Sequence, residues 1–270
     1  MIKRKWSRII KISIIIYCLT GIGIYALQDY VIFRPVKLPG DYQYKFDIPF
    51  KEVNIAYNES TNINIIQFLP RDSLPKGIVL YFHGNRTNIS WYKKFAPYFT
   101  KSGYEVWMID YPGYGKSTGV FSEKLVNEWA LLMYKLARTR LPANKIIIYG
   151  KSLGTGIASH LAAIRNCRYL ILETPYYSLP KLVSFYMPVY PMNRILHYKF
   201  PTFENLPKVT DPVILIHGTN DWTVPYRNSL KLSRFLKPGD KLITVPGGNH
   251  INLYDYPVVP GTIDSLLKDD

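Results

Sequence analysis

The stretch Tyr149-Gly-Lys-Ser-Leu-Gly-Thr-Gly156 decides the fold expected of this 270-residue chain. It follows a strand-like apolar run and opens a helix-like run, so Gly150-x-Ser152-x-Gly154 has the setting of a nucleophile elbow. Such a turn strains the serine backbone, and side chains two positions to either side would collide, which explains the two glycines. The Ser152 hydroxyl is then expected to project above a sheet, with the positive end of the helix beneath it.

Strand-like and helix-like segments alternate on both sides of this turn. A hairpin with strands 52–57 and 62–69 is predicted to open the sheet, because Asn58-Glu-Ser-Thr61 favours a turn. The pattern then predicts strands at 77–82, 105–109, 145–149, 169–172, 213–216 and 241–245, and helices at 122–141, 152–164 and 227–236. Alternation of this kind predicts an α/β fold with a mostly parallel, doubly wound sheet. Reactive groups in such sheets sit at the carboxyl ends of the strands.

Two such strand ends carry an acid and a base. Asp221 follows the strand at 213–216, and its carboxylate is suited to orient a histidine. His250 follows the last strand in Pro-Gly-Gly-Asn-His and is the best placed general base of the five histidines. Glu173, at the end of another strand, is the alternative acid. We therefore expect a catalytic triad of Ser152, Asp221 and His250, in the chain order that accompanies this type of elbow.

The loop Phe82-His-Gly-Asn85 lies at the end of the first central strand. In folds with this elbow, that loop supplies one backbone N–H of the oxyanion hole and the residue after the nucleophile supplies the other. These donors are expected to be Asn85 and Leu153, with Gly84 as the loop glycine. His83 is expected to have a structural role, because it lies inside this loop.

Composition and charge narrow the classes of function. Hydrophobic residues make up 47% of the chain and the formal net charge is +15. The hydrophobic content predicts an ordered domain, and no nucleic-acid motif accompanies the positive charge. Attraction to an anionic membrane surface and a merely solvated basic surface both remain open. Cys18 and Cys167 are placed too differently to form a disulfide. No metal or cofactor is expected, and no oligomeric state is assigned.

The N-terminal segment is predicted to be a membrane anchor. The run from Ile9 to Leu27 is apolar except for Lys11, and as a helix it is about 28 Å long, close to the thickness of a bilayer core. A cleavable signal peptide is the competing interpretation, but Ile24 and Tyr25 before Ala26 do not form a cleavage site. Five basic residues lie within the first eleven positions. They predict a cytoplasmic N-terminus and an extracytoplasmic catalytic domain.

Three segments follow from these observations. Residues 1–28 are expected to be a cytoplasmic basic segment and transmembrane anchor, residues 29–49 a linker and residues 50–270 the α/β domain. The region at about 175–208 is expected to be a cap over Ser152. It is rich in aromatic residues, which either form an apolar acyl pocket or pack the cap onto the core.

Together, these motifs resemble the membrane-anchored, single-span α/β-hydrolase-domain proteins, a serine hydrolase family with lipase, lysophospholipase and depalmitoylase members. The resemblance runs from about Gln28 to about Asn252. It implies hydrolysis of a carboxylic ester or thioester with an apolar acyl group, through an acyl-enzyme and without a cofactor. The substrate would be a small-molecule or lipid acyl compound. An aminopeptidase-like amide hydrolase and a catalytically silent, membrane-tethered binding protein are the alternatives.

Overall fold

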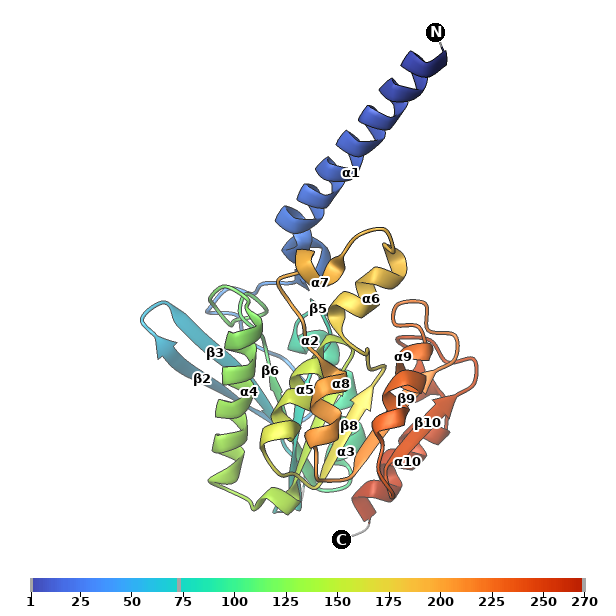
Figure 1. Cartoon of the computed structure of the whole chain (residues 1–270). Helices are drawn as coiled ribbons and strands as arrows, with labels where there is room; N and C mark the ends of the chain where they lie inside the picture. The colour runs from blue at the N-terminus through green and yellow to red at the C-terminus, as the bar shows by residue number, and fades with distance from the viewer. Residues whose placement is uncertain (1, 72–73, 269–270) are drawn as a thin grey trace.

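The computed structural model describes residues 2–71 and 74–268; Met1, 72–73 and 269–270, which belong to the segments expected above, lie outside the described residues. A long helix, α1 (Ile2–Ile32), stands out from a layered body (Figure 1). The carboxyl-terminal end of α1 leads into β1 (Arg34–Pro35), which pairs with β5 (Arg86–Thr87) next to the loop at the end of β4. The anchor segment therefore enters the body beside the edge of the sheet where the reactive groups are expected.

One eight-stranded sheet forms the centre of the body. Its strands are β2 (Phe50–Asn58), β3 (Thr61–Phe68), β4 (Gly77–Phe82), β6 (Tyr104–Ile109), β7 (Ile146–Lys151), β8 (Tyr169–Glu173), β9 (Val213–Gly218) and β10 (Lys241–Val245). Their spatial order is β10-β9-β8-β7-β4-β6-β3-β2. The hairpin β2–β3 and the pair β3–β6 are antiparallel, and all other neighbours are parallel. The mostly parallel sheet with an N-terminal antiparallel hairpin is confirmed.

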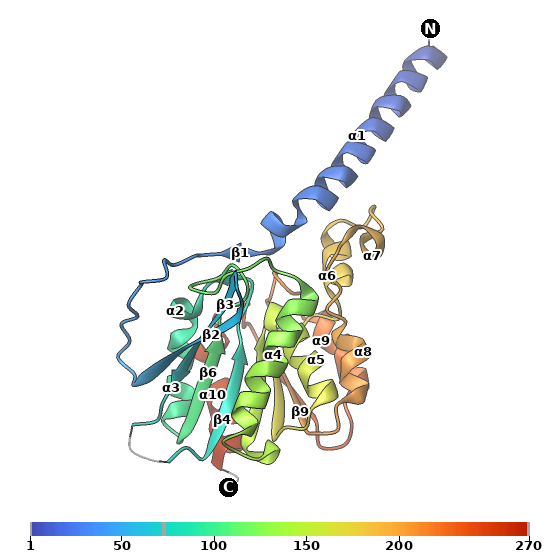
Figure 2. The same ribbon diagram turned by 90° about the vertical axis from the view of Figure 1, so that its left-hand side faces the viewer.

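Helices cover both faces of the sheet (Figure 2). One face carries α4 (Glu123–Arg138), α5 (Leu153–Ile164), α8 (Thr202–Asn205) and α9 (Arg227–Leu232); the other carries α2 (Ile89–Tyr92), α3 (Pro97–Thr100) and α10 (Val258–Lys268). Each layer of helices packs on its own hydrophobic core, the first under α4 and α5 and the second under α2, α3 and α10. Strand β4 shows why helices are needed on both faces, because Leu80 points into the first core and Tyr81 into the second, and both are fully buried. A continuous apolar strand of this kind is stable only when both of its faces are covered.

The expected linker begins later than the sequence pattern indicated. Helix α1 continues through Gln28 to Ile32, into the segment 29–49. Gln28 is 3% exposed, and its side chain bonds the backbone of the cap at Ile195 and His197. The helix is prolonged because its last turn packs against the body. The part Lys5–Ile32 is long and apolar enough to cross a membrane, because an 18-residue window within it has a mean hydropathy of 2.0.

The helices of the structure differ in places from those that the sequence pattern predicts. The helix expected at 227–236 is shorter, because α9 ends at Leu232 and a 3₁₀ turn, Ser233–Phe235, follows. Helix α10 was not predicted, since Pro260 and Gly261 lie in its sequence. Pro260 is tolerated because it lies in the first turn, where backbone N–H groups have no intrahelical partner.

The region at about 175–208 contains α6 (Leu179–Tyr186), α7 (Met192–Ile195) and α8. Helices α6 and α7 project from the body next to the base of α1 (Figures 1 and 2). Tyr198 and Phe200, in the part of the cap that follows α7, are buried in the first core. The cap is therefore anchored to the core on one side and faces α1 on the other.

Candidate active site

Ser152 occupies the sharp turn between β7 and α5. Its backbone has φ 51° and ψ −118°, a conformation that L-residues adopt only under strain. A Cβ on Gly150 would overlap the Gly154 backbone and Ala158, and a Cβ on Gly154 would overlap the backbone oxygen of Phe82. The two glycines are therefore required by close backbone packing, as the sequence pattern predicted.

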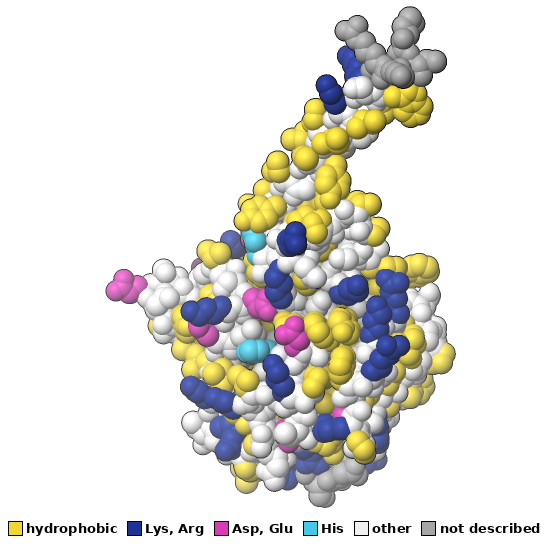
Figure 3. Space-filling view, viewed as in Figure 1, with side chains coloured by type: hydrophobic (Ala, Val, Ile, Leu, Met, Phe, Trp, Pro, Cys, Tyr) yellow, Lys and Arg dark blue, Asp and Glu magenta, His cyan; other side chains and the backbone are white. Residues whose placement is uncertain are grey.

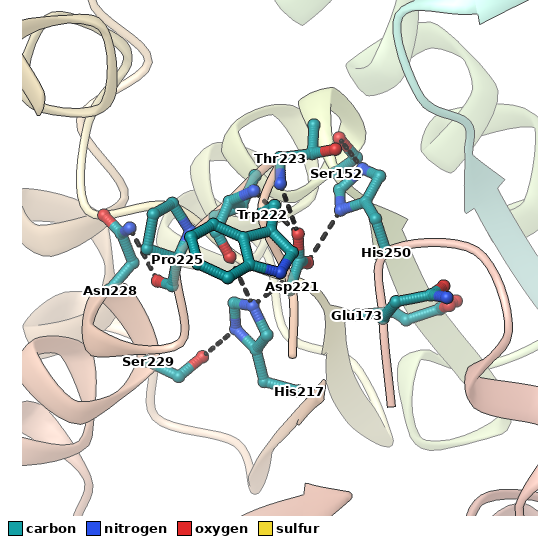
Figure 4. A network of polar contacts seen from close by, with 12 residues as sticks. Ser152, Glu173, His217, Asp221, Trp222, Thr223, Pro225, Asn228, Ser229 and His250 are labelled. Carbon is teal, nitrogen blue, oxygen red and sulfur yellow. Dashed lines mark hydrogen bonds and ion pairs between the residues drawn. The ribbon is translucent and has the colours of Figure 1, made fainter. Parts of the chain in front are cut away.

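The structure brings the three expected residues of the triad together (Figure 4). The Oγ of Ser152 lies 2.9 Å from Nε2 of His250, and Nδ1 of His250 lies 2.8 Å from Oδ2 of Asp221. Ser152, His250 and Asp221 follow β7, β10 and β9, respectively. They are far apart in the sequence, but the carboxyl ends of these parallel strands lie at the same edge of the sheet. Because Asp221 is acceptor-only when charged, it holds the proton of His250 on Nδ1. Nε2 is then free to accept the hydroxyl proton of Ser152.

Asp221 is buried and strongly held in its charged form. The backbone N–H groups of Thr223 and Val224 each donate to its Oδ1 at 2.8 Å. Burial alone would raise the pKa of Asp221, but hydrogen bonds from His217 and His250 outweigh it, so the pKa lies well below its ordinary value of 3.8. The carboxylate therefore stays charged at neutral pH and stabilises a protonated His250.

His217 is a supporting residue that the sequence did not reveal. It is fully buried, and its Nε2 lies 2.8 Å from the carbonyl oxygen of Val224 and 3.2 Å from Oδ2 of Asp221. Its Nδ1 lies 2.7 Å from the hydroxyl of Ser229 on α9. His217 thus connects the Asp221 loop to a neighbouring helix (Figure 4). The only signal in the sequence is its position at the end of a strand, four residues before Asp221.

Glu173, the alternative acid, lies elsewhere. One of its carboxylate oxygens forms a buried ion pair with Lys151, and the other accepts from the Tyr149 hydroxyl at 2.6 Å. The Tyr149 hydroxyl in turn lies 3.1 Å from that of Tyr254. No hydrogen bond joins Glu173 to the His250 side chain among the described residues. The pairing with His250 therefore belongs to Asp221.

The expected oxyanion donors border the same space. Leu153 is the first residue of α5, and Asn85 follows β4. The Asn85 side chain donates to the carbonyl oxygen of Ile32 at 2.6 Å, which fixes this loop to the end of α1. Gly84 lies close to the Ser152 side chain and the Tyr92 hydroxyl. Helix N-termini and such loops present backbone N–H groups to an anion.

His83 is buried behind this loop. Its Nδ1 lies 2.7 Å from the carbonyl oxygen of Gly84, and its Nε2 lies 3.5 Å from Oδ1 of Asp110. Its backbone carbonyl accepts from the Tyr111 hydroxyl at 2.8 Å. These contacts stabilise the loop, and they place the imidazole away from the Ser152 hydroxyl.

A pocket of about 350 Å³ opens in front of the triad. Its lining comes from Gly84, Asn85, Arg86, Thr87, Trp91, Tyr92, Lys151, Ser152, Thr223, His250 and Ile251. Two alternatives were left open for the aromatic residues at 175–208, an acyl pocket and packing on the core. None of the residues that line this cavity lies in 175–208, so the cavity gives no support to the first alternative. The aromatic side of the pocket is supplied instead by Trp91 and Tyr92 of α2.

The cap aromatics serve other contacts. Tyr176, Tyr198 and Phe200 are buried in the core, whereas Phe185 and Tyr186 are exposed at the surface. Aromatic composition alone does not distinguish a side chain that faces a pocket from one that faces a core. Within residues 2–71 and 74–268, no group of three or more His, Cys, Asp or Glu side chains is arranged to hold a metal ion.

A comparison with known proteins gives a partial match to one protein family and several relatives. The family described as "Serine aminopeptidase, S33" matches residues 73–204, a range that includes Gly84 and Ser152 and stops before Asp221. Among curated proteins, lysophosphatidylserine lipase ABHD12 of Danio rerio is 29% identical over 226 residues, which cover 71% of this chain and 58% of that protein. Alpha/beta hydrolase domain-containing protein 17C of Xenopus tropicalis is 31% identical over 183 residues, or 65% of this chain and 57% of that protein. The chain therefore spans less than two thirds of these relatives.

Solved structures share the fold. The esterase Pf2001 of Pyrococcus furiosus superimposes with a TM-score of 0.68 at 17% identity, over 88% of this chain and 97% of that one. Est1E of Butyrivibrio proteoclasticus, bound to ferulic acid, superimposes with a TM-score of 0.63 at 20% identity, over 77% and 95%. At these identities the likeness is one of fold, and it confirms the fold expected from the sequence.

Proposed function

We propose that this chain, which has the α/β-hydrolase fold, is a serine hydrolase that cleaves a carboxylic ester or thioester with an apolar acyl group. The observation that carries the proposal is a strained serine, at φ 51°, whose hydroxyl lies 2.9 Å from a histidine that is itself bound to a buried carboxylate. Strain of this kind persists only where the surrounding structure holds it in place, and it is typical of catalytic residues.

The proposed reaction has two halves. In the first, Nε2 of His250 takes the hydroxyl proton while Ser152 Oγ bonds to the carbonyl carbon, and the protonated His250 then gives that proton to the leaving alcohol or thiol. In the second, His250 takes a proton from water, and the hydroxide adds to the acyl-enzyme. The tetrahedral intermediate formed in this way then loses its bond to Ser152 Oγ, which releases the acid, and the protonated His250 returns the proton to Ser152.

The backbone N–H groups of Asn85 and Leu153 are proposed to bind the oxygen anion in both halves. Asn85 lines the pocket that contains Ser152, and Leu153 directly follows Ser152 as the first residue of α5. Loss of one such donor typically lowers kcat by about 10²- to 10³-fold. Asp221 does not take up the proton; it orients His250 and stabilises the imidazolium.

The pocket supports an ester in preference to a peptide. An aminopeptidase requires an acidic group to bind the free α-ammonium of its substrate, and the pocket lining contains neither Asp nor Glu. Its charged members are Arg86 and Lys151, of which Lys151 is already paired with Glu173, and its apolar members include Trp91 and Ile251. This combination is suited to an acyl chain next to a neutral or anionic group. A lysophospholipid has this chemistry, and the ABHD12 relative is described as a lysophosphatidylserine lipase.

The competing activity remains an amide hydrolase, since the matching family is described as a serine aminopeptidase. A silent, membrane-tethered binding protein has no physical need for a strained serine aligned with a histidine and a buried carboxylate.

We further propose that α1 anchors the protein in a membrane, with the catalytic domain on the extracytoplasmic side. Protease digestion of intact spheroplasts tests this orientation, because cleavage of the C-terminal domain supports it and full protection contradicts it.

The decisive assay compares substrates and variants of the full-length chain in detergent. A series of p-nitrophenyl acyl esters of increasing chain length, a lysophospholipid and an aminoacyl anilide are offered to the unaltered protein, Ser152→Ala and Ser90→Ala. Ser90 lies on α2, near the pocket but outside the triad, and serves as the control. Ester hydrolysis that is lost only in Ser152→Ala supports the proposal. Preferential anilide hydrolysis, or activity that survives in Ser152→Ala, contradicts it.

A further inference from the structure

The cap and the anchor helix are packed together along one side of α1. The rings of Tyr17 and Tyr190 stack with centroids 4.7 Å apart and an interplanar angle of 4°. The Tyr17 hydroxyl donates to the carbonyl oxygen of Val189 at 3.0 Å, and the Tyr190 hydroxyl donates to that of Tyr17 at 3.2 Å. We call the segment 185–191, between the end of α6 and the start of α7, the cap tip. The cap tip therefore contacts α1 at the level of Tyr17.

A second set of contacts lies nearer the body. The ring of Tyr25 packs edge-on against His197 at 4.7 Å, and Gln28 bonds the backbone at Ile195 and His197. From Tyr17 to Gln28 is eleven residues, or about 16 Å along a helix. The cap therefore packs beside α1 over a length equal to about half of the thickness of a bilayer core.

The depth of the cap tip follows from this length. Between Lys11 and Tyr17 the helix has five residues, which extend only about 8 Å. A bilayer core is about 30 Å thick, so the part of the apolar run that lies beyond the cap is far too short to cross it. If α1 spans a membrane, as proposed above, the level of Tyr17 lies inside the hydrocarbon. The cap tip then lies there too.

The cap tip has the surface that this position requires. Residues 182–193 contain no charged side chain, and Phe185, Tyr186 and Val189 are 41%, 51% and 68% exposed. Lys181 and Arg194 flank the stretch, where cations can reach lipid phosphates. Exposed hydrophobic side chains also cover much of α1 (Figure 3). Irregular backbone at membrane depth must have its polar groups paired within the protein, and the Tyr17 hydroxyl provides this partner for the Val189 carbonyl.

We propose that the cap tip is a second membrane-inserted element, which enters the same bilayer beside α1 and contacts acyl chains through Val189. This inference rests on the proposed membrane span and not on the proposed hydrolase chemistry. It has a consequence for the site, because the Tyr186 hydroxyl donates to the backbone carbonyl of Trp222, the residue after Asp221. The cap tip therefore connects the lipid to the rim of the triad loop.

Depth-dependent fluorescence quenching tests the proposal in the full chain. Cys18→Ser removes the exposed thiol, whereas Cys167 is buried and its thiol pKa is raised by burial, so it does not react. Val189→Cys is then added, labelled with an environment-sensitive dye and reconstituted in vesicles of phosphatidylcholine and phosphatidylglycerol. Quenching by lipids with a nitroxide on the acyl chain is measured. Leu74→Cys, at an exposed position just before the start of β4, is the water-facing control, and Ile12→Cys on α1 is the lipid-facing control.

The expected result is acyl-chain quenching at Val189 several times stronger than at Leu74 and comparable with that at Ile12. An unchanged near-ultraviolet circular dichroism spectrum shows that each labelled variant is folded. Quenching at Ile12 without quenching at Val189 overturns the proposal, since α1 would then have separated from the cap in the bilayer. Absence of quenching at both positions also overturns the proposal, because α1 would then not span the membrane. Esterase activity is a separate readout, so failure of the proposed chemistry leaves this result unaffected.

Discussion

The Nζ of Lys151 lies 3.3 Å from the backbone carbonyl oxygen of His250 and donates to it, while it also forms an ion pair with Glu173. Lys151 immediately precedes the strained serine. One buried side chain therefore joins the turn that carries the nucleophile to the loop that carries the base. The short Ser152–His250 distance depends on both loops being held in this register.

Lys151→Met is expected to weaken both stability and catalysis. It leaves Glu173 as an unpaired buried charge, which typically costs about 3–5 kcal/mol of unfolding free energy. It also releases the His250 loop, so kcat is expected to fall more than KM rises. Thermal unfolding and steady-state kinetics in detergent measure the two effects. The double variant Lys151→Met with Glu173→Leu removes both charges and should recover stability without recovering kcat. Full recovery of kcat would contradict a positioning role for Lys151.

Asp221→Asn is expected to lower kcat by about 10⁴-fold, because an amide no longer holds the His250 proton on Nδ1. Binding of substrate should change little, since Asp221 does not line the pocket. Chain-length-matched ester assays give kcat and KM separately. Glu173→Gln is the comparison variant. A larger loss of kcat in Glu173→Gln than in Asp221→Asn would show that Glu173, and not Asp221, orients His250.

Stability should depend on pH through Asp221 in a defined direction. Its pKa in the folded protein is lower than the ordinary 3.8, so below that pH the unfolded chain takes up the proton first. The stabilisation is complete above pH 3.8 and is lost as the pH falls toward the folded pKa. The difference in melting temperature between the unaltered protein and Asp221→Asn should therefore be largest near neutral pH and narrow in acid. A difference that widens in acid would show that the carboxylate is not stabilised in its charged form.

Two glycine substitutions should have opposite effects. Gly154→Ala places a methyl group against the backbone oxygens of Phe82 and His83, which cannot move away cheaply, so folding and activity are expected to fail together. Gly261→Ala lies in α10 with open space around the new methyl group, and should stabilise by about 0.5–1 kcal/mol. Thermal unfolding of the two variants checks both signs. An active, stable Gly154→Ala protein would show that the elbow is less tightly packed than described.

Much of the fold was predictable because apolar strands in a two-sided sheet have a simple signature. The strand expected at 77–82 has the same bounds as β4, since its whole length is apolar and Gly77 begins it. Helix α10 was missed because Pro260 and Gly261 oppose a helix locally, and only packing of Ile263 and its neighbours on the second core decides the matter. Tertiary contacts overrode the local preference.

The site shows the same division. Ser152, Asp221 and His250 each follow a strand, and strand ends of a parallel sheet meet at one edge. His217 and Lys151 were not identified as supporting residues, because their roles come from contacts with Ser229 and Glu173 that no local pattern encodes. The sequence left open whether the cap aromatics form a pocket or pack on the core, for a related reason. An aromatic side chain is equally suited to a core, a pocket or a lipid interface, and only its neighbours distinguish these.

Covalent labelling with a fluorophosphonate probe shows directly whether Ser152 is an activated nucleophile, because the probe reacts with a serine only when a base activates it. The full-length protein, Ser152→Ala, His250→Ala and the control Ser90→Ala are labelled side by side, and the modified peptide is identified by mass spectrometry. We expect labelling at Ser152 in the unaltered protein and in Ser90→Ala, and loss of this labelling in Ser152→Ala and His250→Ala. Absence of labelling in the folded, unaltered protein, or equal labelling of Ser152→Ala, would contradict this expectation.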